Sequence, residues 1–222
     1  MWLFFTACAP SLAPSHDFAD DAMLAALPAD ATLLAGADGG AALPVEVADA
    51  LAAFRRVRAG CFDEGCVALA EGDFGDLDAL RAKVGGVPRR RGVDLGPFVL
   101  RRLAPTKAVA GDRAAVARVA LERELGEPGF DVAALDGLVP EGDAWAAAIG
   151  RDALEALADR AGVELPAADG VEAVGVAVTG EVAVARARCV DEAAALGWAA
   201  LAEARGLSTV RVGRVVEVEV AR

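Results

Sequence analysis

The apolar residues of this sequence come in short runs, most of which end at a glycine, a proline or a charged residue. Beyond the first 16 residues, no uncharged stretch reaches the roughly 18 to 20 residues that a membrane-spanning helix needs. The mean hydropathy of +0.40 reflects alanine above all, since 54 of the 222 residues are alanine. This pattern argues against a protein with several membrane spans and predicts a globular fold of short strands and helices.

The net charge of the chain limits the kinds of molecule that it can bind. The chain has a formal net charge of −12, and 25% of its residues are charged, an ordinary share for a folded protein. A strongly acidic chain repels the phosphates of nucleic acid, so we expect no nucleic-acid partner.

The apolar periodicity predicts strands and helices in alternation. We expect strands at 31–37, 66–70, 98–103 and 107–111, a hairpin at 171–188, and one half-exposed strand at 209–220. We expect helices at 45–58, 76–84, 112–125, 151–161 and 191–205, and a loop at 85–97.

The two halves of the chain resemble each other. Residues 66–70 and the helix that starts at Asp76 are echoed 115 positions later by residues 181–185 and the helix that starts at Asp191. The echo predicts an internal repeat and an α+β fold: two similar strand-helix modules with small, mostly antiparallel sheets and helices packed on one face. We place the modules at 27–126 and 127–222, either separate or packed as one core, after a signal or lipid-attachment segment and linker at 1–26. One α+β core without internal symmetry is the alternative.

Residues that support catalysis are scarce. The single histidine, His16, lies in an N-terminal tail without apparent structure, so we expect neither an enzyme nor a cofactor. Cys61 and Cys66 flank a glycine-containing turn and could form a disulfide; reduced structural thiols are the alternative. Tetrahedral zinc binding would need a further Cys/His pair, and Cys189 alone is left, so no metal site is expected.

Basic residues cluster in the middle of the chain. Residues 83–107 hold seven basic residues and one acidic residue, a net charge of +6, which leaves −18 for the rest. Such a segment on an acidic body predicts an anion site, or contact with an acidic envelope component or protein partner; a solvated loop is the alternative. The candidate anion-binding residues are Arg89, Arg90, Arg91, Arg101 and Arg102.

The N-terminus carries a recognisable pattern. Residues Phe5, Thr6, Ala7 and Cys8 follow a short apolar run, and a spacer rich in proline and serine comes next. This resembles the end of a bacterial lipoprotein signal peptide. The resemblance implies that Cys8 is lipidated and anchors the chain to a membrane, and that Ala9 after this cysteine directs it to the outer membrane.

Together these features predict an exported, lipid-anchored envelope protein that acts as a non-catalytic binding or structural module. It would sit in the outer membrane and face the periplasm or the cell surface. The alternative is a soluble domain that binds a small anion in the cleft between the two modules, in the cytoplasm if the match at Cys8 is accidental.

Overall fold

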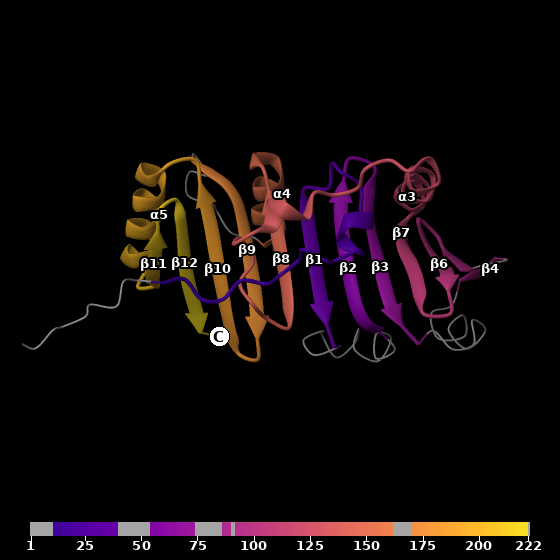
Figure 1. Ribbon diagram of the computed structural model, residues 1–222, viewed down its shortest axis with the longest axis horizontal. Coiled ribbons are helices and arrows are strands. Elements are labelled where there is room, and N and C mark those ends of the chain that lie inside the picture. Colours follow the sequence, from indigo (N-terminus) through magenta and orange to yellow (C-terminus); the bar gives the residue numbers. More distant parts are fainter. Residues whose placement is uncertain (1–10, 40–53, 74–85, 90–91, 162–169, 222) are drawn as a thin grey trace, which may run out of the picture.

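The computed structural model describes residues 11–39, 54–73, 86–89, 92–161 and 170–221. In these residues every named strand belongs to one 12-stranded sheet whose neighbouring strands are all antiparallel (Figure 1). The strands are β1 (Leu33–Asp38), β2 (Phe54–Phe62), β3 (Gly65–Gly72), β4 (Val87–Arg89), β5 (Gly92–Leu95), β6 (Phe98–Ala104), β7 (Lys107–Asp112), β8 (Ala144–Ile149), β9 (Val171–Thr179), β10 (Val182–Cys189), β11 (Ser208–Val212) and β12 (Val215–Ala221). The helices are α3 (Arg113–Leu125), α4 (Arg151–Ala161) and α5 (Glu192–Ala204), with 3-10 turns η1 (Leu24–Ala26) and η2 (Val132–Leu135).

The two halves of the chain meet at the middle of the sheet, where β1 pairs with β8 (Figure 1). Outward from this pair the order is β2, β3, β7 and β6 on one side and β9, β10, β12 and β11 on the other. Strands β5 and β4 extend the first side further. Among the described strands, β4 and β11 therefore form the two edges of the sheet.

Neighbouring residues of β1 define the two faces of the sheet, because successive strand side chains point to opposite sides. Leu34 lies in one apolar cluster with Val67, Val109 and the buried residues of α3, and we call this side the Leu34 face. Leu33 packs with Ala148 and the buried residues of α4 and α5, and this side is the Leu33 face. Helix α3 thus covers one face, and α4 and α5 cover the other.

The predicted fold class is wrong. The chain is mainly β, with one continuous sheet in place of two small ones. Its helices also lie on both faces of the sheet.

The pairing of β1 with β8 explains the continuous sheet. Both strands show the same burial pattern, with no exposed position along their length. A strand that is apolar on both sides cannot remain at a solvent edge, where its unpaired backbone groups would invite aggregation. Each half therefore covers the inner edge of the other.

Three local expectations differ from the structure. The loop expected at 85–97 contains β4 and β5, and Gly92 permits their close approach to β6, because a Cβ there would lie 1.9 Å from the Leu100 carbonyl oxygen. The strand expected at 209–220 is the β11–β12 hairpin, which turns at Gly213 with a φ of 57°. Residues 54–58, expected to be helical, begin β2. Residues 45–53 of the first expected helix and the whole helix expected at 76–84 lie outside the described residues.

Two extended segments lie on the Leu34 face before they enter the sheet. The N-terminal segment, residues 11–32, leads into β1, and the central segment, residues 126–143, leads into β8. They contact each other through isolated bridges between Ser15 and Pro140 and between Pro28 and Gly129. His16, expected in a tail without structure, donates its backbone N–H to the Val139 carbonyl at 2.9 Å.

Arg186 on β10 holds the start of the N-terminal segment. Its side chain is fully buried, and its Nε donates to the Glu217 carboxylate on β12 at 2.7 Å. The guanidinium also donates to the Ser15 hydroxyl at 2.6 Å and to the Ala13 carbonyl. Glu217 in turn accepts the Ala13 N–H at 3.1 Å. A buried charge is stable only when it is paired and hydrogen-bonded, so the N-terminal segment completes this site.

We expect Arg186→Met to lower the free energy of unfolding by about 3 to 5 kcal/mol, because it leaves the buried Glu217 carboxylate without its cation. Adding Glu217→Gln removes that buried charge and restores part of the loss. Urea denaturation measures both effects. Arg188→Met is the matched control, since Arg188 lies on the same strand and donates only to the Asp136 carbonyl among the bonds described. Equal losses in Arg186→Met and Arg188→Met would contradict this account.

Candidate functional site

The structure confirms the disulfide between Cys61 and Cys66. The two residues face each other across the β2–β3 hairpin, with their Cα atoms 4.0 Å apart. Cys189 is a free, buried thiol whose pKa is raised by burial and, to a smaller degree, by Asp191 and Glu172. A buried thiol with a raised pKa is a poor nucleophile, so Cys189 serves packing.

Three predicted site residues, Cys8, Arg90 and Arg91, lie outside the described residues. Lipid attachment at Cys8 therefore stays a prediction. Within the described ranges, none of the helices has both the length and the apolar character needed to cross a bilayer.

A second buried arginine joins the N-terminal segment to the first half of the sheet. Arg58 on β2 is 1% exposed, and its Nε donates to Asp21 of that segment at 2.7 Å. A second nitrogen donates to Asp38 at the end of β1 at 3.0 Å. His16 Nε2 lies 3.6 Å from the same Asp38 carboxylate, and the His16 ring packs on Phe18 at 4.6 Å.

The network lowers the pKa of Asp38. Partial burial alone would raise its pKa, but the hydrogen bond and charge of Arg58, helped by Arg56 and His16, outweigh burial and hold the pKa below its usual value. The carboxylate form of Asp38 is therefore part of the folded state.

Two of the four basic residues that the structure describes in the basic segment, Arg89 and Lys107, have acidic partners. Arg89 and Arg113 both contact Asp94, at 2.7 and 3.3 Å. The hydrogen bond from Arg89, supported by Arg113, lowers the pKa of Asp94. Lys107 pairs with Glu71 at 3.2 Å.

Arg101 and Arg102 lie on opposite faces of the sheet. Arg101 is opposite Val109 in the β6–β7 register and shares the Leu34 face, whereas Arg102 is opposite Ala108, which packs in a separate cluster with Leu100. Arg102 donates to the Ala104 carbonyl of its own strand at 3.3 Å. The two adjacent arginines cannot bind one small anion together.

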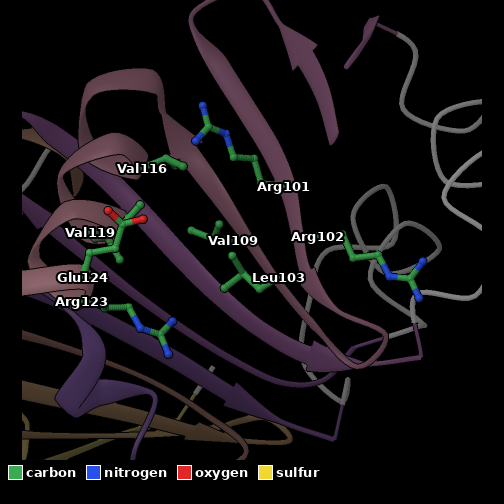
Figure 2. Close-up of a pocket in the computed structure, with 9 residues that line it drawn as sticks. Arg101, Arg102, Leu103, Val109, Val116, Val119, Arg123 and Glu124 are labelled. Atoms are coloured by element: carbon green, nitrogen blue, oxygen red, sulfur yellow. The ribbon is translucent and has the colours of Figure 1, made fainter. Parts of the chain in front are cut away.

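A pocket lies beside Arg101, between α3 and the β6–β7 hairpin (Figure 2). Its volume is about 360 Å³, and we call it the Arg101 groove. The groove is lined by Arg101, Arg102, Leu103, Val109, Val116, Val119, Ala120, Arg123 and Glu124. Figure 2 shows Arg102 pointing away from the other side chains. The groove lies within the first half of the sheet, away from the β1–β8 junction, so it is not a cleft between two modules.

Charged side chains flank an apolar base in this groove. Val109, Val116 and Val119 are all at least 96% buried, while Arg101 and Arg123 are exposed. Among the described residues, neither guanidinium takes part in a hydrogen bond or an ion pair. Leu103 and Ala120 are the exposed apolar residues of the lining, so the groove can offer two cations and a small apolar surface to one ligand.

Sequence reasoning missed Arg123 and the contribution of α3. The helix was predicted at 112–125, and Val116 and Val119 have the spacing of an inward-facing stripe, but nothing in the sequence shows that this stripe packs beside β6. A neighbouring pocket of about 400 Å³ also includes Arg101, together with the Arg89, Asp94 and Arg113 cluster.

Comparison with known proteins shows likeness at the level of structure. No protein-family model and no curated protein matches this chain. Solved structures of TP0453 do match. Crystal form I has a TM-score of 0.60 at 7% identity, covering 90% of this chain and 93% of that chain. Crystal form III has a TM-score of 0.61 at 7% identity, covering 95% of each. Crystal form IV has a TM-score of 0.58 at 9% identity, covering 89% and 92%. At this identity the likeness shows a shared fold.

The lowered pKa of Asp38 predicts a loss of stability in acid. A carboxylate with a depressed pKa stabilises the fold fully above its unfolded pKa near 4, and this contribution is lost as the pH falls through the folded pKa. We expect Asp38→Asn to be less stable than wild type at pH 7 and to lose less stability on acidification. Urea midpoints at pH 7, 5, 4 and 3 test this. The exposed Asp20→Asn should behave as wild type, and an Asp38→Asn profile parallel to wild type would contradict the prediction.

Proposed function

We propose that this chain is an exported bacterial envelope protein, anchored to a membrane by a lipid on Cys8, whose folded body is a non-catalytic binding or structural module. The proposal rests chiefly on where the folded body begins. Ala13, five residues after Cys8, is already bound to Arg186 and Glu217. Five residues span at most about 17 Å. A lipid on Cys8 would therefore keep the β10–β12 part of the sheet next to the membrane.

Two further observations support the envelope assignment. TP0453, whose fold this chain shares, is a membrane-associated lipoprotein of Treponema. The Cys61–Cys66 disulfide is of the kind that persists in oxidising compartments such as the periplasm. The finer assignment to the outer membrane, facing the periplasm or the surface, rests on Ala9 and on the resemblance to lipoprotein signal peptides.

The surroundings of the one histidine support a non-catalytic role. The contacts described for the His16 side chain are to Phe18, Trp145 and Asp38. No serine or cysteine nucleophile is among them, as a nucleophile-base pair would require. We propose that the module instead acts by binding, and that its partner carries negative charge.

The matching strand order on the two sides of the β1–β8 pair supports an internal repeat. In this proposal β1, β2, β3, β6 and β7 correspond to β8, β9, β10, β11 and β12. Strands β4 and β5 are then an addition to the first half. This addition carries Arg89 and Asp94, next to the Arg101 groove.

Metabolic labelling with palmitate in a bacterial host tests the anchor. Wild type should be labelled and recovered with the membranes, and Cys8→Ala should lose both properties because the acceptor thiol is gone. Cys189→Ala is the matched control and should keep the label, since Cys189 is buried in the fold. An unlabelled wild-type chain in the cytosolic fraction would refute the proposal.

A further inference from the structure

We propose that the Arg101 groove binds a small organic anion, a single phosphate or carboxylate group carried on an apolar body. This inference goes beyond the proposed function, because the groove is built from α3, β6 and β7 and does not depend on a lipid at Cys8.

The base of the groove provides the apolar half of the site. Val116 and Val119 come from α3, and Val109 comes from β7, which packs against that helix. Leu103, near the β6–β7 turn, is 49% exposed and adds apolar surface to the lining. A ligand with an apolar body would bury this surface, which water now covers in part.

Arg101 and Arg123 provide the charged half. Three arginines near the groove or on the same face have carboxylate partners: Arg58 binds Asp21 and Asp38, Arg113 contacts Asp94, and Arg118 binds Asp30, Glu64 and Glu122. Arg101 and Arg123 have no such partner among the described residues. A guanidinium offers two parallel N–H groups that match a phosphate or carboxylate, so these two can still accept an anion.

The geometry links the two halves of the site. Arg101 lies directly opposite Val109 in the β6–β7 register, and Figure 2 shows Val109 and Leu103 between Arg101 and Arg123. A ligand whose anionic group binds Arg101 would place its apolar body against the exposed Leu103 and Ala120, above the buried valines.

Charge and size limit the ligand further. Glu124 also lines the groove and would repel a second negative group, which favours one anionic group over a polyanion. The volume of about 360 Å³ lies near the lower end of the roughly 300 to 1,000 Å³ typical of ligand pockets. The groove therefore accepts one short apolar body.

Calorimetric titration with hexyl phosphate tests the proposal. The protein is the full chain carrying Cys8→Ala, so that the result is separate from lipid anchoring. We expect saturable binding of one molecule per chain, with hexanol and inorganic phosphate each binding at least about tenfold more weakly.

Two matched pairs of variants locate the binding site. Arg101→Gln should weaken hexyl phosphate binding about tenfold or more, and Arg211→Gln should not, because Arg211 is an exposed arginine on β11, at the other end of the sheet. Ala120→Trp should block the groove, whereas Ala117→Trp should not, because both alanines are exposed on α3 but only Ala120 lines the groove. All four positions are at least partly exposed, and urea denaturation confirms that each variant is folded.

Vesicle flotation distinguishes two sources of such an anion. Arg101-dependent binding to phosphatidylglycerol vesicles, absent with phosphatidylcholine, supports the proposal with a lipid headgroup as the source. Binding of hexyl phosphate without vesicle binding supports it with a free small anion. Equal losses in Arg101→Gln and Arg211→Gln, or hexyl phosphate binding no tighter than hexanol or phosphate, would overturn the proposal. Because hexyl phosphate binding is measured on the Cys8→Ala chain, its result does not depend on the outcome of the palmitate experiment.

Discussion

Two buried arginines on the Leu34 face fix how this fold is assembled. Arg58 and Arg186 are each at most 1% exposed, and each depends on the N-terminal segment for part of its hydrogen bonding. A buried guanidinium without partners would cost several kcal/mol, so residues 13–21 are a structural requirement of the sheet. Arg58 lies on β2 and Arg186 on β10, so each half of the sheet has one buried arginine that holds the N-terminal segment.

A helix or hairpin could be predicted from the sequence where the residues of that segment alone determine its structure. Helix α3 and the β9–β10 hairpin were expected within a residue or two, because apolar periodicity and a glycine turn act over short distances. The continuous sheet was not predictable, because the pairing of β1 with β8 joins strands more than a hundred positions apart. The alternating valines of β11 and β12 concealed a hairpin, since the alternation continues across the turn at Gly213.

The candidate site could likewise be predicted only in part from the sequence. Sequence reasoning placed Arg101 and Arg102 in one cationic patch, but adjacent residues of a strand project to opposite faces. The charge of +6 in residues 83–107 is also less available than its sum indicates, since Glu71, which lies outside that segment, neutralises Lys107. A binding surface depends on cations that lack partners, and that property emerges only when strands from distant segments are brought together.

The bond between Ala13 and Glu217 also bears on the order in which the chain folds. These residues are separated by 204 positions. The start of the N-terminal segment can therefore dock only after β12, the last described strand, is in place. Contacts of such long range form late, because a large loop must close before they contribute. The docking of Ala13 onto Arg186 and Glu217 is therefore a late step of folding.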